Sequence, residues 1–470
     1  MTNGKPLELV RGLGSWASAS IVVGTMIGTG IFLKPAEMAA EGKSLAVVFA
    51  AWIAGGLLTL FGALAFAELG AALPEAGGEY AYLRRGFGPA WGFLFGWMHS
   101  VVGRPASMAS IAAGFLRFCS FLAPAVAQPI FAWQGVNPFS GSSYSFVFTW
   151  AQPLAVVPLA ALALVNYLGV RAGGRVQVVL TVTKISAVFA IIILGFVLAR
   201  PEGPRTEPYL PASYGATLLT GFFGALAAAL WAYDGWEDLN LVGSEVQDPQ
   251  RNIPRALIRG VLFCAAVYIL FSAVCHWVLP FEAVAASEHV ASDAFALIAG
   301  RNAALWVTVA MAISALGTLN ASVLSGARVP YAMARDGLFF RAARTIHPRF
   351  RTPGRALLIE FVLASILVLS GSFEELTSLF LFSTWIFYGL AVAALMRLRI
   401  SEPNLERPYR CWGYPWVPLT FITGAAALTS ALWLARPVRS SIGLVLILCG
   451  LFFYKYWRNT NAENPQPGGG

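Results

Sequence analysis

The chain has 470 residues, of which 57% are hydrophobic and only 12% are charged. This charged fraction is about half that of a soluble globular protein, so the composition excludes a soluble enzyme with an ordinary core and a disordered scaffold. The five cysteines are an odd number and include no Cys-x-x-Cys pair, which excludes a disulfide-built secreted domain. The net charge of +9 would indicate nucleic-acid binding only if the basic residues lay on one solvated face. In so apolar a chain, the basic residues are better explained as marking the cytoplasmic side of a membrane.

Apolar stretches long enough to cross a bilayer recur along the whole sequence. A spanning helix needs about 20 apolar residues, and on this basis the sequence predicts an all-α polytopic membrane protein with twelve transmembrane helices. The expected spans are 15–40, 44–71, 88–121, 151–168, 177–199, 217–243, 256–279, 302–334, 357–371, 374–396, 413–434 and 439–457.

Lysine and arginine gather in alternate loops, with an excess of about three to one on the side that includes both termini. This bias predicts a multi-pass protein of the plasma (inner) membrane with cytoplasmic N- and C-termini. No cleavable signal peptide is visible, because the first apolar run opens after Arg11 and lacks a small-x-small cleavage site. We expect a cytoplasmic segment 1–14, a single transmembrane domain 15–457 and a disordered cytoplasmic tail 458–470.

The expected first helix has glycines at positions 24, 28 and 30, near its middle. Glycine weakens a helix, and an unwound segment exposes backbone N–H groups that can hold a carboxylate at the start of the next half-helix. Gly24 and Gly28 also have the Gly-x-x-x-Gly spacing of a helix-packing face. Close packing and unwinding are both readings of this segment, and the third glycine favours unwinding.

The expected sixth helix contains three carboxylates within five residues, Asp234, Glu237 and Asp238. Carboxylates at membrane depth must line a polar cavity, pair with cations or mark the membrane edge. The simpler reading is that a loop begins at Glu237 and Asp238. The apolar residues that continue to Gly243 argue against this reading. Asp234 is the carboxylate that we expect to face a cavity.

Broken helices at the first and sixth positions have the spacing of inverted repeats, here about 15–199 and 217–396, followed by two extra helices at about 413–457. Both breaks would then meet at the midplane. Lys184 lies within the expected fifth helix, where its ammonium needs carbonyl or hydroxyl partners unless it snorkels to the interface. A fixed cation there can hold the broken first helix against the eighth.

At these residues the chain resembles the amino acid/polyamine/organocation superfamily, and within it the L-type amino acid transporter branch. The resemblance covers nearly the whole chain, and its motifs are specific by their order and spacing. They are Gly24–Phe32, Gly77–Leu83, Arg104–Ser107, Arg175–Gln177 with Lys184, Asp234–Trp236 with Glu245, Asn252, Pro254 and Ala256, Asn320, Ser322 and Arg328, Arg335–Gly337, and Glu406–Tyr409.

The resemblance implies a LeuT-like fold of five plus five helices with alternating access. It also implies a site for an L-amino acid and roles for individual residues, with no cofactor and no metal. The substrate carboxylate is expected at Thr25, Met26, Gly28, Thr29 and Gly30, and the α-ammonium at Trp231, Ala232, Asp234 and Gly235. Gating or coupling is expected from Trp231, from Lys184 with Ser322 and Ser325 beside its ammonium, and from Phe382 and Trp385.

Two departures refine the resemblance. The loop at about 122–150 has no cysteine, whereas animal light chains of this branch use one to bind a glycoprotein; we therefore expect no disulfide-linked ancillary subunit. Asp234 resembles the counter-charge for cationic side chains in one light chain, but also a residue of bacterial serine/threonine exchangers. Glu237 stands where a neutral residue is expected, and its role stays open.

The resulting hypothesis is a sodium-independent amino acid exchanger or facilitator in the lipid bilayer, for neutral substrates with acceptance of cationic ones. The alternatives are a proton-coupled amino acid permease or a polyamine or amine permease of the same superfamily. A polytopic enzyme has no visible catalytic motif, since the four histidines lack metal-ligand spacing. A channel or receptor fits two midplane breaks less well, and no nucleic-acid partner is expected.

Overall fold

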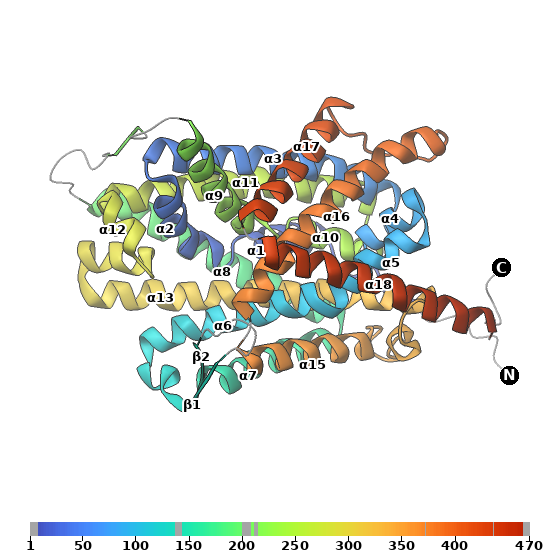
Figure 1. Ribbon diagram of the computed structural model, residues 1–470, viewed down its shortest axis with the longest axis horizontal. Coiled ribbons are helices and arrows are strands. Elements are labelled where there is room, and N and C mark those ends of the chain that lie inside the picture. The colour runs from blue at the N-terminus through green and yellow to red at the C-terminus, as the bar shows by residue number, and fades with distance from the viewer. Residues whose placement is uncertain are drawn as a thin grey trace.

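A computed structural model describes residues 8–136, 143–199, 208–210, 215–371, 373–435 and 437–463 of the chain. Within these ranges, long helices pack side by side into a bundle (Figure 1). Its first half consists of α1 (Ser15–Met26), α2 (Gly30–Gly42), α3 (Leu45–Ala72), α4 (Glu79–Phe87), α5 (Pro89–Met98), η1 (His99–Gly103), α6 (Arg104–Leu122), η2 (Pro124–Ala127), β1 (Pro129–Val136), β2 (Ser143–Thr149), α7 (Ala151–Tyr167) and α8 (Val170–Leu198).

The second half of the bundle again begins with a broken helix. It consists of α9 (Ala216–Tyr233), α10 (Asp238–Leu241), η3 (Gly243–Glu245), α11 (Pro249–Val278), α12 (Phe281–Ala286), α13 (Val290–Gly326), α14 (Arg328–Arg335), η4 (Arg341–Arg344), α15 (Gly354–Ser370), α16 (Phe373–Ser401), α17 (Trp416–Ala435) and α18 (Pro437–Glu463).

Ten helical segments in the described part of the chain are long and apolar enough to cross a membrane. Two further helices of 17 residues, α7 and α15, occupy the expected fourth and ninth spans. The prediction of a helical, multi-pass membrane protein is therefore confirmed.

The chain is not purely helical, because β1 and β2 pair as an antiparallel hairpin between α6 and α7. From the sequence this region is expected only as a loop. Both strands are rich in aromatic and β-branched residues, which favour extended backbone. The last helix also continues to Glu463, past the expected end at 457, so residues 458–463 are helical and not a tail.

Several helices begin earlier than the apolar pattern indicates. Helix α8 starts at Val170, after Gly169 with a φ of 140°, so Lys184 lies mid-helix and about 21 Å from its start at 1.5 Å per residue. Helix α13 starts at Val290 and kinks at Gly300, whose φ of 76° is non-helical. To reach the membrane interface, the Lys184 side chain would therefore have to extend along half of α8.

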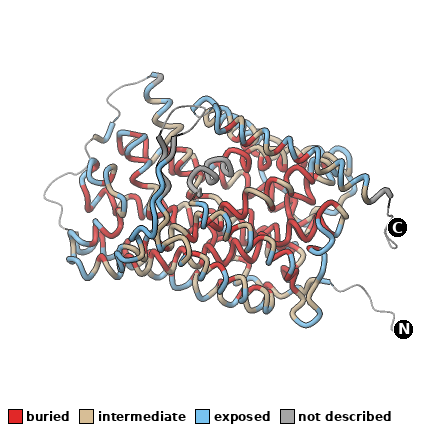
Figure 2. Tube along the Cα trace, turned by 60° about the horizontal axis from the view of Figure 1, so that its bottom comes forward, coloured by how far each residue is buried: buried red, intermediate tan, exposed pale blue. Residues whose placement is uncertain are grey.

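Segments that the charge bias assigns to opposite sides of the membrane lie at opposite ends of the bundle. The β1–β2 hairpin and α12, both expected outside, lie at one end of its long axis (Figure 1). Helix α4 and the C-terminal part of α18, both expected inside, lie at the other end. Buried residues fill the middle of the bundle, and exposed ones cover its flanks (Figure 2).

Helix α1 lies in this buried middle, packed against α8, α11 and α13, while α2 packs against α9. The central position of the first broken helix brings its unwound residues next to the second broken helix.

Buried charged residues outside the breaks form ion pairs. Arg328 binds Glu245 through two contacts of 2.6 and 3.1 Å, and both side chains are buried. Glu68 on α3 binds Arg399 at 2.5 Å and Arg407 at 3.3 Å. Each pair joins segments that are far apart in the sequence, and removing one partner would leave an uncompensated buried charge.

Candidate functional site

The first helix is interrupted over residues 27–29, between the end of α1 at Met26 and the start of α2 at Gly30. Both readings of its glycines hold. A Cβ added to Gly24 would lie 2.1 Å from the Gln177 side chain, and one added to Gly28 would lie 2.7 Å from the Thr318 hydroxyl. The glycines therefore allow close packing, and the helix also breaks beside them, leaving the first N–H groups of α2 without partners inside the helix.

The sixth helix is interrupted over residues 234–237, between α9 and the four-residue helix α10. Gly235 has a φ of 93°, which L-side chains rarely adopt, and a Cβ there would lie 2.8 Å from the Cβ of Thr25. Glu237 and Asp238 are buried. The simpler reading, in which they begin a surface loop, is therefore wrong.

The two breaks are in direct contact. The Thr25 hydroxyl lies 2.8 Å from the carbonyl oxygen of Gly235, and a Cβ on Gly30 would lie 2.9 Å from the Cα of Ala232. Thr25 therefore joins the two breaks, while Met26 and Thr29 are buried beside it.

Tyr268 on α11 is a bridging residue that the sequence analysis misses. Its hydroxyl lies within hydrogen-bonding distance of the carbonyl oxygens of Met26 and Ala232, the second at 2.8 Å. One side chain thus reaches the last turn before each break. A tyrosine in an apolar helix looks like core, and its hydroxyl, which needs a partner when buried, is the only sequence signal.

Lys184 of α8 contacts the first break. Its partners on the expected eighth span, which is helix α13, differ from the predicted ones. Its ammonium donates to the carbonyls of Gly24 at 2.7 Å, Ile27 at 2.6 Å and Ser314 at 3.1 Å, and lies 3.2 Å from the Thr318 hydroxyl. The side chain is fully buried, so it does not snorkel.

The prediction that Ser322 and Ser325 neighbour this ammonium is wrong. They lie one to two helical turns beyond Thr318 on α13, about 6 to 10 Å along the axis. Ser325 instead donates to the Ala321 carbonyl at 2.9 Å and lies beside Asp238. The actual partners on α13 are Ser314 and Thr318, and they are determined by how far α13 is shifted along α8.

The carboxylates of the second break have unequal partners. Asp234 accepts a hydrogen bond of 3.0 Å from the Tyr388 hydroxyl. Asp238 forms a buried, two-pronged ion pair with Arg104 of α6, one contact being 3.2 Å. The Oε2 atom of Glu237 is buried and has no hydrogen-bond partner among the described residues.

Just outside the spans, Glu79 opens helix α4 and lies electrostatically close to Arg104 and Asp238. Its Oε2 atom also lacks a hydrogen-bond partner among the described residues. Burial raises the pKa of the Glu79 carboxyl to about 8, so this group holds a proton at neutral pH.

The aromatic gate candidates differ in where they lie. Trp231 is partly exposed, its ring lies beside Gly30, and the Lys34 ammonium sits 4.6 Å from the ring centroid. Phe382 and Trp385 are buried, and their rings contact Trp433 and Phe421 of α17. The structure thus brings Trp231 to the breaks, whereas on α16 it is Tyr388 that reaches them.

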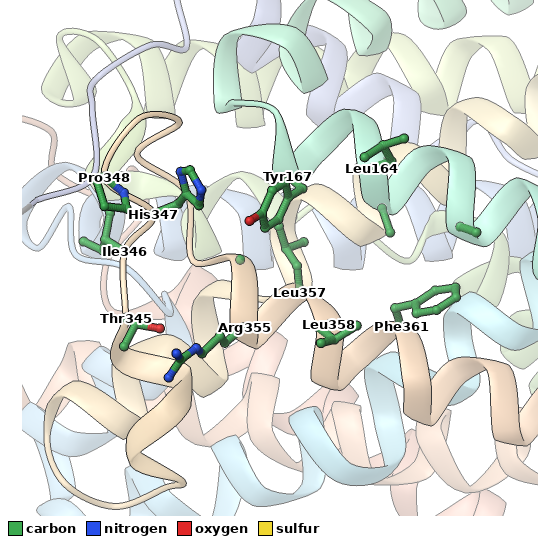
Figure 3. A pocket seen from close by; sticks show the side chains of 13 residues that line it. Leu164, Tyr167, Thr345, Ile346, His347, Pro348, Arg355, Leu357, Leu358 and Phe361 are labelled. Carbon is green, nitrogen blue, oxygen red and sulfur yellow. The ribbon is translucent and has the colours of Figure 1, made fainter.

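A cavity of about 550 Å³ lies elsewhere, between α7 and α15 (Figure 3). Leu164 and Phe361 belong to its apolar part, and Thr345, His347 and Arg355 to its polar part. None of the predicted site residues lines this cavity. The two helix breaks therefore form a separate site.

Comparison with known proteins assigns the chain to a family. The model of the family described as "Amino acid permease" matches residues 13–453. The serine/threonine exchanger SteT of Bacillus subtilis (strain 168) is 32% identical over 460 residues, which cover 97% of this chain and 98% of SteT. The b(0,+)-type amino acid transporter 1 of Homo sapiens is 33% identical over 456 residues, covering 96% and 88% of the two chains.

The Homo sapiens cystine/glutamate transporter is a third relative, 30% identical over 96% of this chain and 84% of its own. The match to the family model extends over both broken helices, Lys184 and the buried ion pairs. The chain belongs to the amino acid permease family.

Proposed function

We propose that this protein is a sodium-independent amino acid transporter that exchanges or facilitates its substrates by alternating access. The observation that carries the proposal is the contact between two helix breaks, made by Thr25 and Gly235 and bridged by Tyr268. The family is one of permeases and the relatives bear the names of transporters and exchangers, so the chain is a transporter and not an enzyme.

In this proposal the zwitterionic part of an L-amino acid binds between the breaks. The carboxylate meets the positive end of α2 at Gly28, Thr29 and Gly30, where backbone N–H groups and the helix dipole favour an anion. The α-ammonium meets carbonyl oxygens at the end of α9 and the carboxylate of Asp234. Trp231, beside Gly30, closes over the substrate.

Lys184 supplies the positive charge that keeps the unwound carbonyls of Gly24 and Ile27 against α13. A protein-borne ammonium at this point makes a sodium ion unnecessary for assembling the site. This is the physical basis for proposing sodium independence.

The proposed membrane arrangement has twelve spans with α7 and α15 included, a LeuT-like pair of inverted repeats at about 15–199 and 217–396, and cytoplasmic termini in the plasma membrane. Phe382 and Trp385 retain a proposed gating role through movement of α16 against α17. We propose that the protein works without a disulfide-linked subunit.

Binding of matched ligands tests this function against the amine-permease alternative. Leucine, its amine analogue isoamylamine and its acid analogue isocaproate are compared by calorimetry on the purified protein in sodium-free buffer. Because each break binds one end of the amino acid, both analogues should bind at least about tenfold more weakly than leucine, which corresponds to about 1.4 kcal/mol. Equal binding of isoamylamine and leucine would favour the amine permease.

A further inference from the structure

We propose that Glu237 carries an exchangeable proton, which leaves when an amino acid with a cationic side chain binds and stays when a neutral one binds. This inference rests on the proposed amino acid transport. Its consequence is that exchange of arginine for leucine moves one proton against each arginine and transfers no net charge.

Glu237 is the one carboxylate of the second break that has a buried oxygen without a hydrogen-bond partner among the described residues. Its side chain is 4% exposed, and its Oε2 atom has no hydrogen-bond partner among the described residues. Asp238 is compensated by Arg104, and Asp234 receives the Tyr388 hydroxyl. Glu237 has the Tyr388 hydroxyl near it but no cation of its own, and one of its oxygens has no donor. An ionised carboxylate in this position is too costly at this depth, so Glu237 holds a proton when no cation is near.

The charged surroundings of Glu237 point the same way. The groups that face it are Asp234 and Asp238 of its own segment, Glu79 of α4, Arg104 of α6 and Tyr388 of α16. Arg104 is the only cation among these groups, and its two-pronged contact with Asp238 already uses its charge. An ionised Asp234 repels a negative charge on Glu237.

The hydroxyl of Tyr388 explains how the protonated form is held. A hydroxyl has one hydrogen to donate, and that of Tyr388 is directed at Asp234. Its oxygen can still accept, and Glu237 is its electrostatic neighbour. A protonated Glu237 therefore completes a chain in which it donates to Tyr388 and Tyr388 donates to Asp234.

A proton fits this cluster better than a metal ion. In the part of the chain that the structure describes, no three His, Cys, Asp or Glu side chains converge as metal ligands. The carboxylates instead surround the break, where a substrate side chain arrives. An entering guanidinium supplies the positive charge that lets Glu237 ionise, and the proton leaves to the side of the membrane then open.

The charge of the loaded site is then the same for both substrates. A neutral amino acid travels with protonated Glu237, and a cationic one travels with ionised Glu237. Arginine entering in exchange for leucine leaving therefore exports one proton, and the balance of charge is zero.

Proteoliposomes loaded with leucine and a trapped pH-sensitive dye test the proposal. Arginine added outside should raise the internal pH by about one proton per arginine taken up, whereas leucine added outside should leave it unchanged. An imposed potassium diffusion potential should not alter the rate of arginine uptake. Arginine uptake without a change of internal pH, or uptake accelerated by an inside-negative potential, would overturn the proposal.

Two variants and one matched control assign the proton to a residue. In Glu237→Gln the pH change per arginine should be lost, and in Glu237→Asp it should persist. Glu360→Gln removes another buried carboxylate that has no hydrogen-bond partner among the described residues. Glu360 lies on α15 beside Arg104 and is not part of the interrupted segment 234–237, so this variant should keep the pH change. Loss of the pH change in Glu360→Gln but not in Glu237→Gln would refute the assignment.

The proposed function fails separately. If no labelled amino acid exchanges at all, amino acid transport itself is wrong. If leucine exchanges but arginine is neither bound nor taken up, transport stands and the role of Glu237 is overturned.

Discussion

Replacing Lys184 by methionine keeps the length of the side chain and removes its ammonium from the carbonyls of Gly24 and Ile27. A buried polar group that loses its partner costs about 1–3 kcal/mol. The Thr318 and Ser314 hydroxyls still reach these two carbonyls, each at 3.1 Å, so we expect the lower part of the summed range, about 2–4 kcal/mol. At 1.36 kcal/mol per factor of ten, the assembled site becomes about 30- to 1,000-fold rarer.

The assay is leucine exchange in proteoliposomes, normalised to folded protein by gel filtration and melting temperature. The fold should persist, because methionine keeps the apolar volume of the lysine side chain and the Ser314 and Thr318 hydroxyls still reach the two carbonyls. Thr183→Ala is the matched control, because that hydroxyl lies on an exposed part of α8 and donates to the Val179 carbonyl of its own helix. Exchange by well-folded Lys184→Met within threefold of the wild-type rate would refute the role given to the lysine.

Three further changes have defined outcomes. Gly235→Ala forces a side chain into a positive-φ position 2.8 Å from Thr25, and leucine affinity should fall at least about tenfold; unchanged affinity by calorimetry would contradict the contact between the breaks. Tyr268→Phe removes only the bridging hydroxyl, and exchange should fall about fivefold to 150-fold, as expected for a loss of about 1–3 kcal/mol; a wild-type rate would show that the bridge is dispensable. The folded-state pKa of Glu79, about 8, lies above its usual 4.5, so its stabilising effect is complete below about pH 4.5 and is lost as the pH rises through 8. The wild-type melting temperature should therefore fall between pH 6 and pH 9, and that of Glu79→Gln should fall less; equal slopes would contradict the raised pKa.

The sequence predicts both helix breaks because the features that cause them are local. Three glycines at positions 24, 28 and 30 and an acidic run starting at Asp234 are visible without any knowledge of tertiary structure. A lysine within an apolar span also predicts oxygen atoms close to its ammonium group. These signals fix where the chain departs from regular helix.

Partner identity depends on how helices shift and rotate against each other, which the apolar pattern does not encode. Ser322 and Ser314 both lie on α13. Only the position of α13 along α8 makes Ser314, and not Ser322, a partner of Lys184. Tyr268 is missed for the same reason, since nothing in its own helix indicates that it faces two breaks. The β1–β2 hairpin, by contrast, had a signal in its aromatic and β-branched residues around the sequence Asn137-Pro138.

Counterflow tests the central claim most directly. Labelled leucine, serine, alanine and arginine are offered in sodium-free medium to proteoliposomes with and without unlabelled amino acid inside. The account predicts sodium-independent uptake, accelerated by internal substrate if the protein exchanges and unaccelerated if it facilitates. Absence of uptake for all four amino acids, or uptake that appears only when sodium is added, would contradict it.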